Sequence, residues 1–229
     1  MRLYTNQTLA VGEEVTLATD TSHRLQKVMR ARVGDRLTLF NGTGGEYAAE
    51  LMSLTKKSAT VSIKEFVDCD RESPLFISLI QGISRGNRMD YTIQKSVELG
   101  VQEIIPVETK RSIVKLEGSR KDSRHEHWQG VIIHACEQSG RTKIPALRSA
   151  IPLTDIAAMD NIEQSFFLDT QSTTPIGPEQ KPTGRSYVIA GPEGGFSDEE
   201  RAWIGRLGAT PIKLGPRILR TETAALAVL

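Results

Sequence analysis

The hydrophobic pattern of the chain changes near Ser73, and this change constrains the fold more than any other feature. Before it, residues 36–40 and 59–64 alternate apolar and polar side chains, which is typical of half-buried strands. Between these segments, Asn41 to Gly45 tolerates the positive φ angles that a hairpin requires. Residues 1–72 are therefore expected to form a small β-barrel domain.

From residue 73 to residue 229, strands are expected to alternate with helices. Residues 75–83 are almost continuously apolar, as in a strand covered on both faces, and Met89, Ile93 and Val97 then recur at helical spacing before Gly100. This alternation predicts an α/β fold with a mainly parallel sheet and helices on its faces. Further strands are expected at residues 103–107, 166–168, 187–189 and 212–214, and a further helix at residues 125–139.

The bulk composition is that of an ordinary globular chain of 229 residues with a formal net charge of +1. Its apolar runs are too short to span a membrane, and its first residues do not resemble a signal peptide. Cys69 and Cys136 have no spacing typical of a metal site, and two reduced thiols in a cytoplasmic protein are expected. No metal is expected.

Basic residues gather in two places. One group includes Lys115 and lies between residues 110 and 124; the other lies on a helix predicted from about Ser22 to Arg30, with Leu25, Val28 and Met29 on its inner face. Such groups can contact RNA phosphates, but a solvated surface is the better interpretation of charge alone. A long polar loop at residues 170–184 is expected to be functional or mobile.

Two glycine-containing segments follow the last two predicted strands, where parallel sheets bind their ligands. In the first, residues 190–196 lead to Ser197 and Glu200, which form the Ser-x-x-Glu pattern of a helix capping box. Its glycines would let the backbone approach a flat ligand, although a tight turn explains them equally well. The second, residues 214–224, combines an arginine, hydroxyls and a carboxylate, with Thr221 as the expected N-cap of a last helix.

Together these segments resemble the ribosomal RNA small-subunit methyltransferase E family, of the SPOUT class of trefoil-knotted methyltransferases. The resemblance covers essentially the whole chain and includes an N-terminal domain similar to the RNA-binding PUA barrel. The matching segments are Gly191 to Ser197 with Glu200, Leu214 to Ala224, Gly86 to Asp90, Gln94 to Val101 and Glu137 to Arg141.

The resemblance implies an activity that neither composition nor spacing could show. The expected enzyme transfers a methyl group from S-adenosyl-L-methionine to N3 of a uridine in 16S rRNA of the small ribosomal subunit, at position 1498 in the family, and releases S-adenosyl-L-homocysteine. It also implies a cytoplasmic homodimer, with residues 1–72 as the PUA-like domain and residues 73–229 as the SPOUT domain with a C-terminal knot. The last helix, which reaches Leu229, is expected to be longer in the family.

The resemblance, the chemistry of methyl transfer and the placing of basic residues together suggest roles for individual residues. Arg220 is the candidate for stabilising the uracil anion, and Glu222 or Glu193 is the candidate base, although Glu222 could simply favour a helix N-terminus and Arg220 could contact cofactor or phosphate. The expected RNA contacts are Arg24, Lys27, Arg30, Arg88, Arg111, Gln138 and Arg141. The expected cofactor contacts are Leu168, Asp169, Gly191, Pro192, Glu193, Gly194, Gly195, Leu214, Gly215, Ile218, Leu219, Arg220, Thr221 and Thr223.

Two alternatives stay open. A SPOUT enzyme that methylates a ribose 2′-hydroxyl would carry Ser-Leu-Asn in its last loop, where this chain has Ile218 to Thr223. A non-catalytic RNA-binding protein would have no use for both glycine-containing segments.

Overall fold

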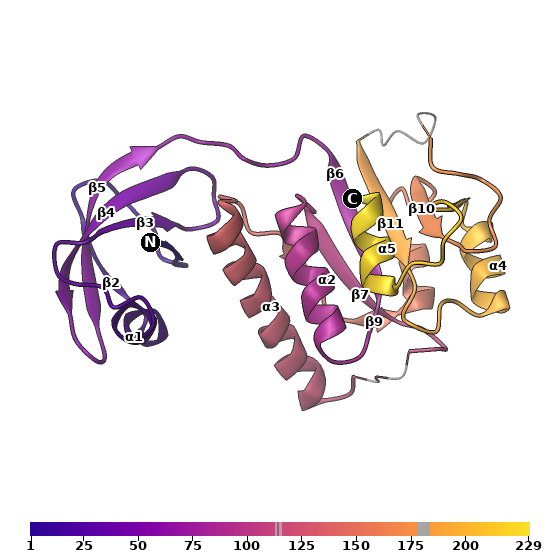
Figure 1. The fold of residues 1–229 in the computed structure, drawn as a ribbon, viewed down its shortest axis with the longest axis horizontal. Helices are drawn as coiled ribbons and strands as arrows, with labels where there is room; N and C mark the ends of the chain where they lie inside the picture. Colours follow the sequence, from indigo (N-terminus) through magenta and orange to yellow (C-terminus); the bar gives the residue numbers. More distant parts are fainter. Residues whose placement is uncertain (113, 115, 178–183) are drawn as a thin grey trace. The chain divides into compact units, whose positions relative to one another are not determined.

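The computed structural model describes residues 1–112, 114, 116–177 and 184–229 (Figure 1). The chain forms two compact units, residues 1–72 with 136–144 and residues 73–135 with 145–229. The short segment 136–144 thus packs with the first unit, whereas the sequence analysis placed it in the second domain. Lys115 and residues 178–183, which belong to the predicted basic group and the predicted long loop, lie outside the described residues.

The first unit is built on a five-stranded sheet with the order β1-β3-β4-β5-β2. All its neighbouring strands are antiparallel except β1 and β3, and its core is made by fully buried leucines such as Leu3, Leu39 and Leu51. The strands predicted at residues 36–40 and 59–64 are confirmed. The elements are β1 (Arg2–Tyr4), β2 (Glu14–Leu17), α1 (Thr19–Lys27), β3 (Arg36–Phe40), β4 (Glu46–Leu54) and β5 (Ala59–Val67).

Helix α1 is shorter at its C-terminus than the sequence suggests, because it ends at Lys27. Leu25 is fully buried and Met29 packs on the core, as expected, but Val28 is 74% exposed, so its predicted place on the inner face is wrong. Val28 lies at the end of the helix, and Arg30 adopts a positive φ of 52° just beyond it. The helical spacing therefore no longer applies at Val28.

The second unit is an α/β structure around a seven-stranded sheet, in which every recorded strand pair is parallel. Its main order is β12-β10-β11-β6-β7-β8, with β9 beside β7. The predicted fold class is confirmed. The strands are β6 (Phe76–Gly82), β7 (Glu103–Glu108), β8 (Ala146–Leu147), β9 (Ile151–Pro152), β10 (Ser165–Leu168), β11 (Arg185–Ala190) and β12 (Thr210–Ile212), and the helices are α2 (Asn87–Glu98), α3 (Ser119–Ser139), the 3-10 helix η1 (Leu153–Ala158), α4 (Asp198–Arg206) and α5 (Thr221–Val228).

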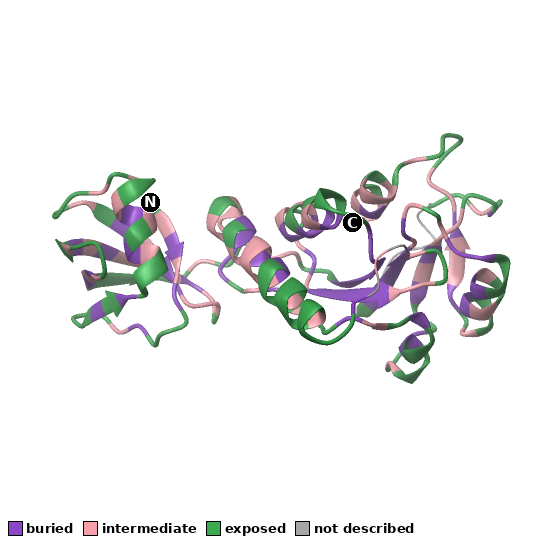
Figure 2. Cartoon of the chain, turned by 90° about the horizontal axis from the view of Figure 1, so that it is seen from below, coloured by how far each residue is buried: buried purple, intermediate pink, exposed green. Residues whose placement is uncertain are grey.

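Helices cover both faces of this sheet, and the buried strands lie between them (Figure 2). Successive strand residues point to opposite faces. Ile80 and Ile189 pack with Ile156 and Ile204, which belong to η1 and α4. On the other face, α5 lies against β11 and α2.

Helix α2 shows how the local sequence fixes an element. Met89, Ile93 and Val97 are buried at helical spacing, as predicted. Gly100 takes a φ of +97° and donates its amide to the Val97 carbonyl, so it ends the helix in the left-handed conformation that favours glycine.

Among the described residues, no helix is both long enough and apolar enough to cross a membrane.

Candidate active site

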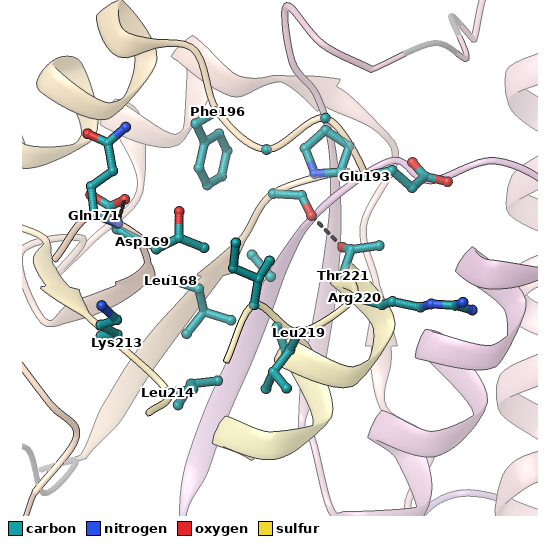
Figure 3. A pocket seen from close by; sticks show the side chains of 18 of the residues that line it. Leu168, Asp169, Gln171, Glu193, Phe196, Lys213, Leu214, Leu219, Arg220 and Thr221 are labelled. Atoms are coloured by element: carbon teal, nitrogen blue, oxygen red, sulfur yellow. Dashed lines mark hydrogen bonds between the residues drawn. The ribbon is translucent and has the colours of Figure 1, made fainter. Parts of the chain in front are cut away.

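The segments that follow β10, β11 and β12 meet at the carboxyl end of the sheet and enclose a cavity of about 860 Å³ (Figure 3). Because these strands are parallel neighbours, their ends lie on one edge. Leu168, Phe196, Leu214 and Leu219 provide apolar wall, and residues 190–195 provide glycine-rich backbone. This is the volume and the mixed lining of a small-ligand site.

The first of these segments is Gly191 to Gly195, between β11 and α4. Gly195 has a φ of +64° and donates its amide to the Pro192 carbonyl, which closes a tight turn. The predicted capping box is confirmed: the Ser197 hydroxyl accepts from the Glu200 amide, and the Glu200 carboxylate accepts from the Ser197 amide. Both the turn and the helix start are therefore specified locally.

The second segment runs from Leu214 to Thr221. Gly215 has a φ of +77°, and Ile218 is 84% exposed although it lines the cavity. Helix α5 begins at Thr221, its N-cap is Arg220, and no side chain of the described residues caps it. The predicted N-cap role of Thr221 is therefore wrong, because its hydroxyl donates instead to the Gly191 carbonyl.

A buried side chain that the sequence analysis missed joins the two segments. Gln81, near the end of β6, is fully buried, and its Nε2 lies 3.2 Å from the Gly191 carbonyl and 3.2 Å from Thr221 Oγ1. The available signal was a single amide at the carboxyl end of a mostly apolar strand.

The third wall comes from the end of β10. The carboxylate of Asp169 accepts from the Gln171 amide at 2.9 Å and from Arg201 Nε at 3.2 Å, and all three residues line the cavity. Figure 3 shows Leu168, Asp169 and Gln171 on one side of the cavity. Neither Gln171 nor Arg201 was predicted to line the site. Arg201 reaches it from α4, a helix that the prediction did not connect with the cavity.

Glu193 is tied to the start of α2. One of its oxygens accepts from the Arg85 amide at 2.9 Å and from Arg88 Nη1 at 3.0 Å. Burial raises the pKa of the Glu193 carboxyl, but these two hydrogen bonds and the backbone amide of Glu193 outweigh burial, so the pKa lies below its ordinary value. Nearby, Arg111 Nη1 donates to the Gly194 carbonyl at 3.0 Å.

The other two catalytic candidates differ from Glu193. Glu222 lines the cavity, and its Oε2 is buried with no hydrogen-bond partner among the described residues. Arg220 also lines the cavity, is exposed, and points to the side on which Glu193 lies (Figure 3). The three candidates thus border one cavity, but only Glu193 is committed to neighbouring groups by recorded hydrogen bonds.

Of the predicted cofactor contacts, all line the cavity except Thr223. Thr223 is exposed on the first turn of α5, where successive side chains point in different directions.

The predicted RNA contacts divide into two kinds. Five are exposed, namely Lys27, Arg30, Arg88, Arg111 and Gln138. Arg24 is half-buried and pairs with Glu137 at 2.7 Å. Arg141 is buried and its Nε donates to Glu72 at 2.8 Å, so the structure contradicts its predicted role as an RNA contact. The Arg141 guanidinium pairs with Glu72 inside the first unit. Spacing along the sequence could not show this pairing.

Both cysteines are free thiols, as expected. Burial raises the pKa of the Cys136 thiol to about 12. Within the described ranges, no three His, Cys, Asp or Glu side chains are grouped so that they could hold a metal ion.

Comparison with known proteins defines the class first. The model of an RNA methyltransferase domain matches residues 71–229, and that of an RNA methyltransferase PUA domain matches residues 17–64. The two matched ranges correspond to most of the second unit and to part of the first. The fold and site are therefore those of an RNA methyltransferase with a PUA domain.

Relatives narrow the class. The chain is 31% identical over 231 residues to ribosomal RNA small subunit methyltransferase E of Buchnera aphidicola, covering all of this chain and 90% of the relative. It matches the crystal structure of that enzyme from Neisseria gonorrhoeae bound to S-adenosyl methionine with 40% identity and a TM-score of 0.94, over 99% of this chain and 94% of the other. A Legionella pneumophila methyltransferase in complex with the same cofactor matches at 37% identity and a TM-score of 0.94, over the same shares. The chain belongs to the ribosomal RNA small subunit methyltransferase E family.

Proposed function

We propose that the protein transfers the methyl group of S-adenosylmethionine to N3 of a uridine in 16S rRNA, at the position that the resemblance gives as 1498. The observation that carries this proposal is the buried, uncommitted carboxylate oxygen of Glu222 in the cavity. A uracil N3 must lose its proton to become nucleophilic, and an unpaired carboxylate beside the ligand can take it.

The cavity fits the proposed cofactor. Its volume of about 860 Å³ lies in the range for small-molecule sites, and its leucines can pack on an adenine ring. A Cβ added at Gly191 would lie 3.2 Å from the Gly195 Cα, so the turn is tightly packed at Gly191. The cofactor would supply the methyl group as a sulfonium donor, and S-adenosylhomocysteine would remain.

The structure favours Glu222 over Glu193 as the base. Glu193 already accepts two hydrogen bonds and its pKa is lowered, which makes it a weaker proton acceptor. Glu222 Oε2 is buried with no hydrogen-bond partner among the described residues, so it is free to accept a hydrogen from a base placed in the cavity. The N3 proton would pass to Glu222 as the N3–methyl bond forms and the methyl–sulfur bond breaks.

Arg220 would stabilise the anion that develops over N3 and the flanking carbonyl oxygens of the ring. It is exposed at the rim of the cavity, so it can reach a base presented from outside. A cation aimed at developing charge contributes more to the transition state than to the ground state. Arg88 and Arg111 line the same cavity and are proposed phosphate contacts.

We also propose the other properties that the family resemblance implies. They are a homodimer in the cytoplasm, a C-terminal trefoil knot in the domain of residues 73–229, a PUA-like RNA-binding domain in residues 1–72, and the small ribosomal subunit or its 16S rRNA as partner. Lys27, Arg30 and Gln138 are exposed and remain proposed RNA contacts.

The test is the identity of the product. Unmodified 16S rRNA and unmodified small subunits are incubated with the protein and labelled S-adenosylmethionine, and nucleosides are separated by mass spectrometry. N3-methyluridine from one site supports the proposal. A 2′-O-methylated nucleoside would instead support ribose methylation, and no methylated nucleoside with either substrate would contradict the proposal.

A matched pair of variants then separates the two carboxylates. Glu222→Gln should lower kcat by roughly 10²–10⁴-fold with little change in cofactor affinity, because it keeps the shape and removes the base. Glu193→Gln should lower kcat less, because its carboxylate is already engaged by Arg85 and Arg88. A larger loss of kcat in Glu193→Gln would reverse the assignment.

A further inference from the structure

Gln81 has a buried side-chain amide whose place is explained neither by the fold nor by the catalytic step. Its side chain is fully buried near the end of β6, and its Nε2 has three oxygens within hydrogen-bond distance. These are the Gly82 carbonyl at 3.0 Å, the Gly191 carbonyl at 3.2 Å and Thr221 Oγ1 at 3.2 Å. With the amide turned over, Oε1 would face two carbonyls that cannot donate, so this orientation is the one that chemistry allows.

The hydroxyl of Thr221 extends this arrangement. It lies within reach of the Gln81 amide and donates its own proton to the Gly191 carbonyl. The Gly191 carbonyl therefore accepts from both side chains. One buried amide thus links the end of β6, the loop after β11 and the first residue of α5.

The backbone at Gly82 supports the same close approach independently. A Cβ added at Gly82 would lie 2.5 Å from both N and Cδ of Pro192 and 2.9 Å from the Gly191 carbonyl carbon. These distances are far below any van der Waals contact, so only glycine lets β6 come this near to the loop. The strand end and the loop are pressed together where Gln81 joins them.

The carbonyl oxygen of the Gln81 side chain lacks the hydrogen bonds that its nitrogen makes. Gln81 Oε1 is buried and has no hydrogen-bond partner among the described residues. A buried acceptor without a partner costs stability, and an apolar side chain at this place would avoid that cost. A residue that costs stability at the edge of a binding cavity is typical of function.

We propose that Gln81 is a positioning residue, which holds the two glycine-containing segments of the cavity together before the cofactor binds. This inference rests on the proposed function, because both segments are the proposed cofactor contacts. A site that is already assembled does not lose affinity to the ordering of its loops. Without the Gln81 amide, Gly191 keeps one donor, and the loop becomes free to adopt other conformations.

The experiment measures S-adenosylmethionine binding by calorimetry on the full chain and its variants. Gln81→Met should weaken the affinity about tenfold or more, the scale on which one or two hydrogen bonds act, with little loss of thermal stability. Thr221→Val should weaken it similarly, while Thr221→Ser, which keeps the hydroxyl, should restore it. The matched control is Gln102→Met, at a half-buried glutamine just before β7, which should bind as the wild type does.

Two further measurements separate positioning from general damage. In the Gln81→Met and Thr221→Val double variant, the losses should not multiply, because both remove one linked arrangement. Without cofactor, the amides of residues 191–195 should exchange hydrogen faster in Gln81→Met than in wild type, while those of β7 should not change. If Gln81→Met does not fold, the Thr221→Val and Thr221→Ser pair decides.

The outcomes are distinguishable. No binding by the folded wild type would contradict the proposed function itself. Binding by the wild type with equal affinity in Gln81→Met, or in Thr221→Val where Gln81→Met does not fold, would overturn the positioning role and leave the proposed function intact.

Discussion

Charged side chains in the first unit pair with one another beside its apolar core, whereas in the second unit those at the carboxyl ends of the strands border a cavity. In the first unit, Arg141 is buried against Glu72, and Arg24 pairs with Glu137. In the second unit, Arg220 is exposed and Glu222 Oε2 is buried without a partner among the described residues. Glu193 and Asp169 at the cavity are hydrogen-bonded too, but Glu222 Oε2 is left without a partner there among the described residues.

This comparison separates motifs that look equivalent in the sequence. Glu137 to Arg141 and Leu214 to Ala224 both carried the family resemblance. The first segment binds to its own unit, since Arg2 also donates to the Cys136 and Arg141 carbonyls at 2.6 and 2.7 Å. The second borders the cavity. A motif can therefore mark structure or function, and burial with partners distinguishes the two.

The largest effect on stability should come from breaking the buried pair in the first unit. Arg141→Met should lower the free energy of unfolding by about 3–5 kcal/mol, because it leaves the Glu72 carboxylate buried without its opposite charge. Arg141→Met with Glu72→Met should lose much less. Hydrogen exchange of β3 and β4 amides in urea measures this loss. Equal losses in the single and double variants would show that the charge pair does not hold this unit together.

In the second unit, Arg220→Ala should impair methylation rather than folding. We expect kcat to fall roughly 10²–10³-fold, as for loss of a group aimed at transition-state charge, with the melting temperature nearly unchanged. Steady-state methylation of small subunits measures this. A loss of stability in Arg220→Ala with wild-type kcat would contradict a catalytic role for this arginine.

A smaller effect concerns acid stability. The hydrogen bond from Arg71 lowers the pKa of Glu46, burial opposes it and Arg2 adds to the lowering, so the folded pKa lies below the ordinary value of 4.5. Glu46 therefore stabilises the fold above pH 4.5, and this contribution is lost as the pH falls below 4.5 through the folded pKa. Glu46→Gln should flatten the dependence of stability on pH in this window. Denaturant unfolding between pH 3 and pH 7 measures the slope, and an unchanged slope would contradict the role of the two arginines.

The parts that could be predicted from the sequence are those with local signals. The apolar spacing of α2, the Gly100 terminus and the Ser197–Glu200 capping box each depend on residues a few positions apart. The position of the site at the carboxyl edge of the sheet could be predicted as well, because neighbouring parallel strands end on the same edge.

The parts that could not be predicted depend on contacts between distant residues. Arg141 meets Glu72 across 69 positions, and Gln81 meets Thr221 across 140. Neither pairing leaves a periodic trace. Val28 was misplaced for a different reason, since the spacing of α1 holds only as far as Lys27.

The most direct test of the central claim is S-adenosylmethionine binding with the cavity open and blocked. Leu168→Trp fills the cavity wall at the end of β10, and Leu75→Trp is its matched control before the start of β6, away from the carboxyl ends of the strands. The account predicts that calorimetry detects binding to the wild type and to Leu75→Trp, and none to folded Leu168→Trp. Unchanged binding in Leu168→Trp, or no binding to the folded wild type, would contradict it.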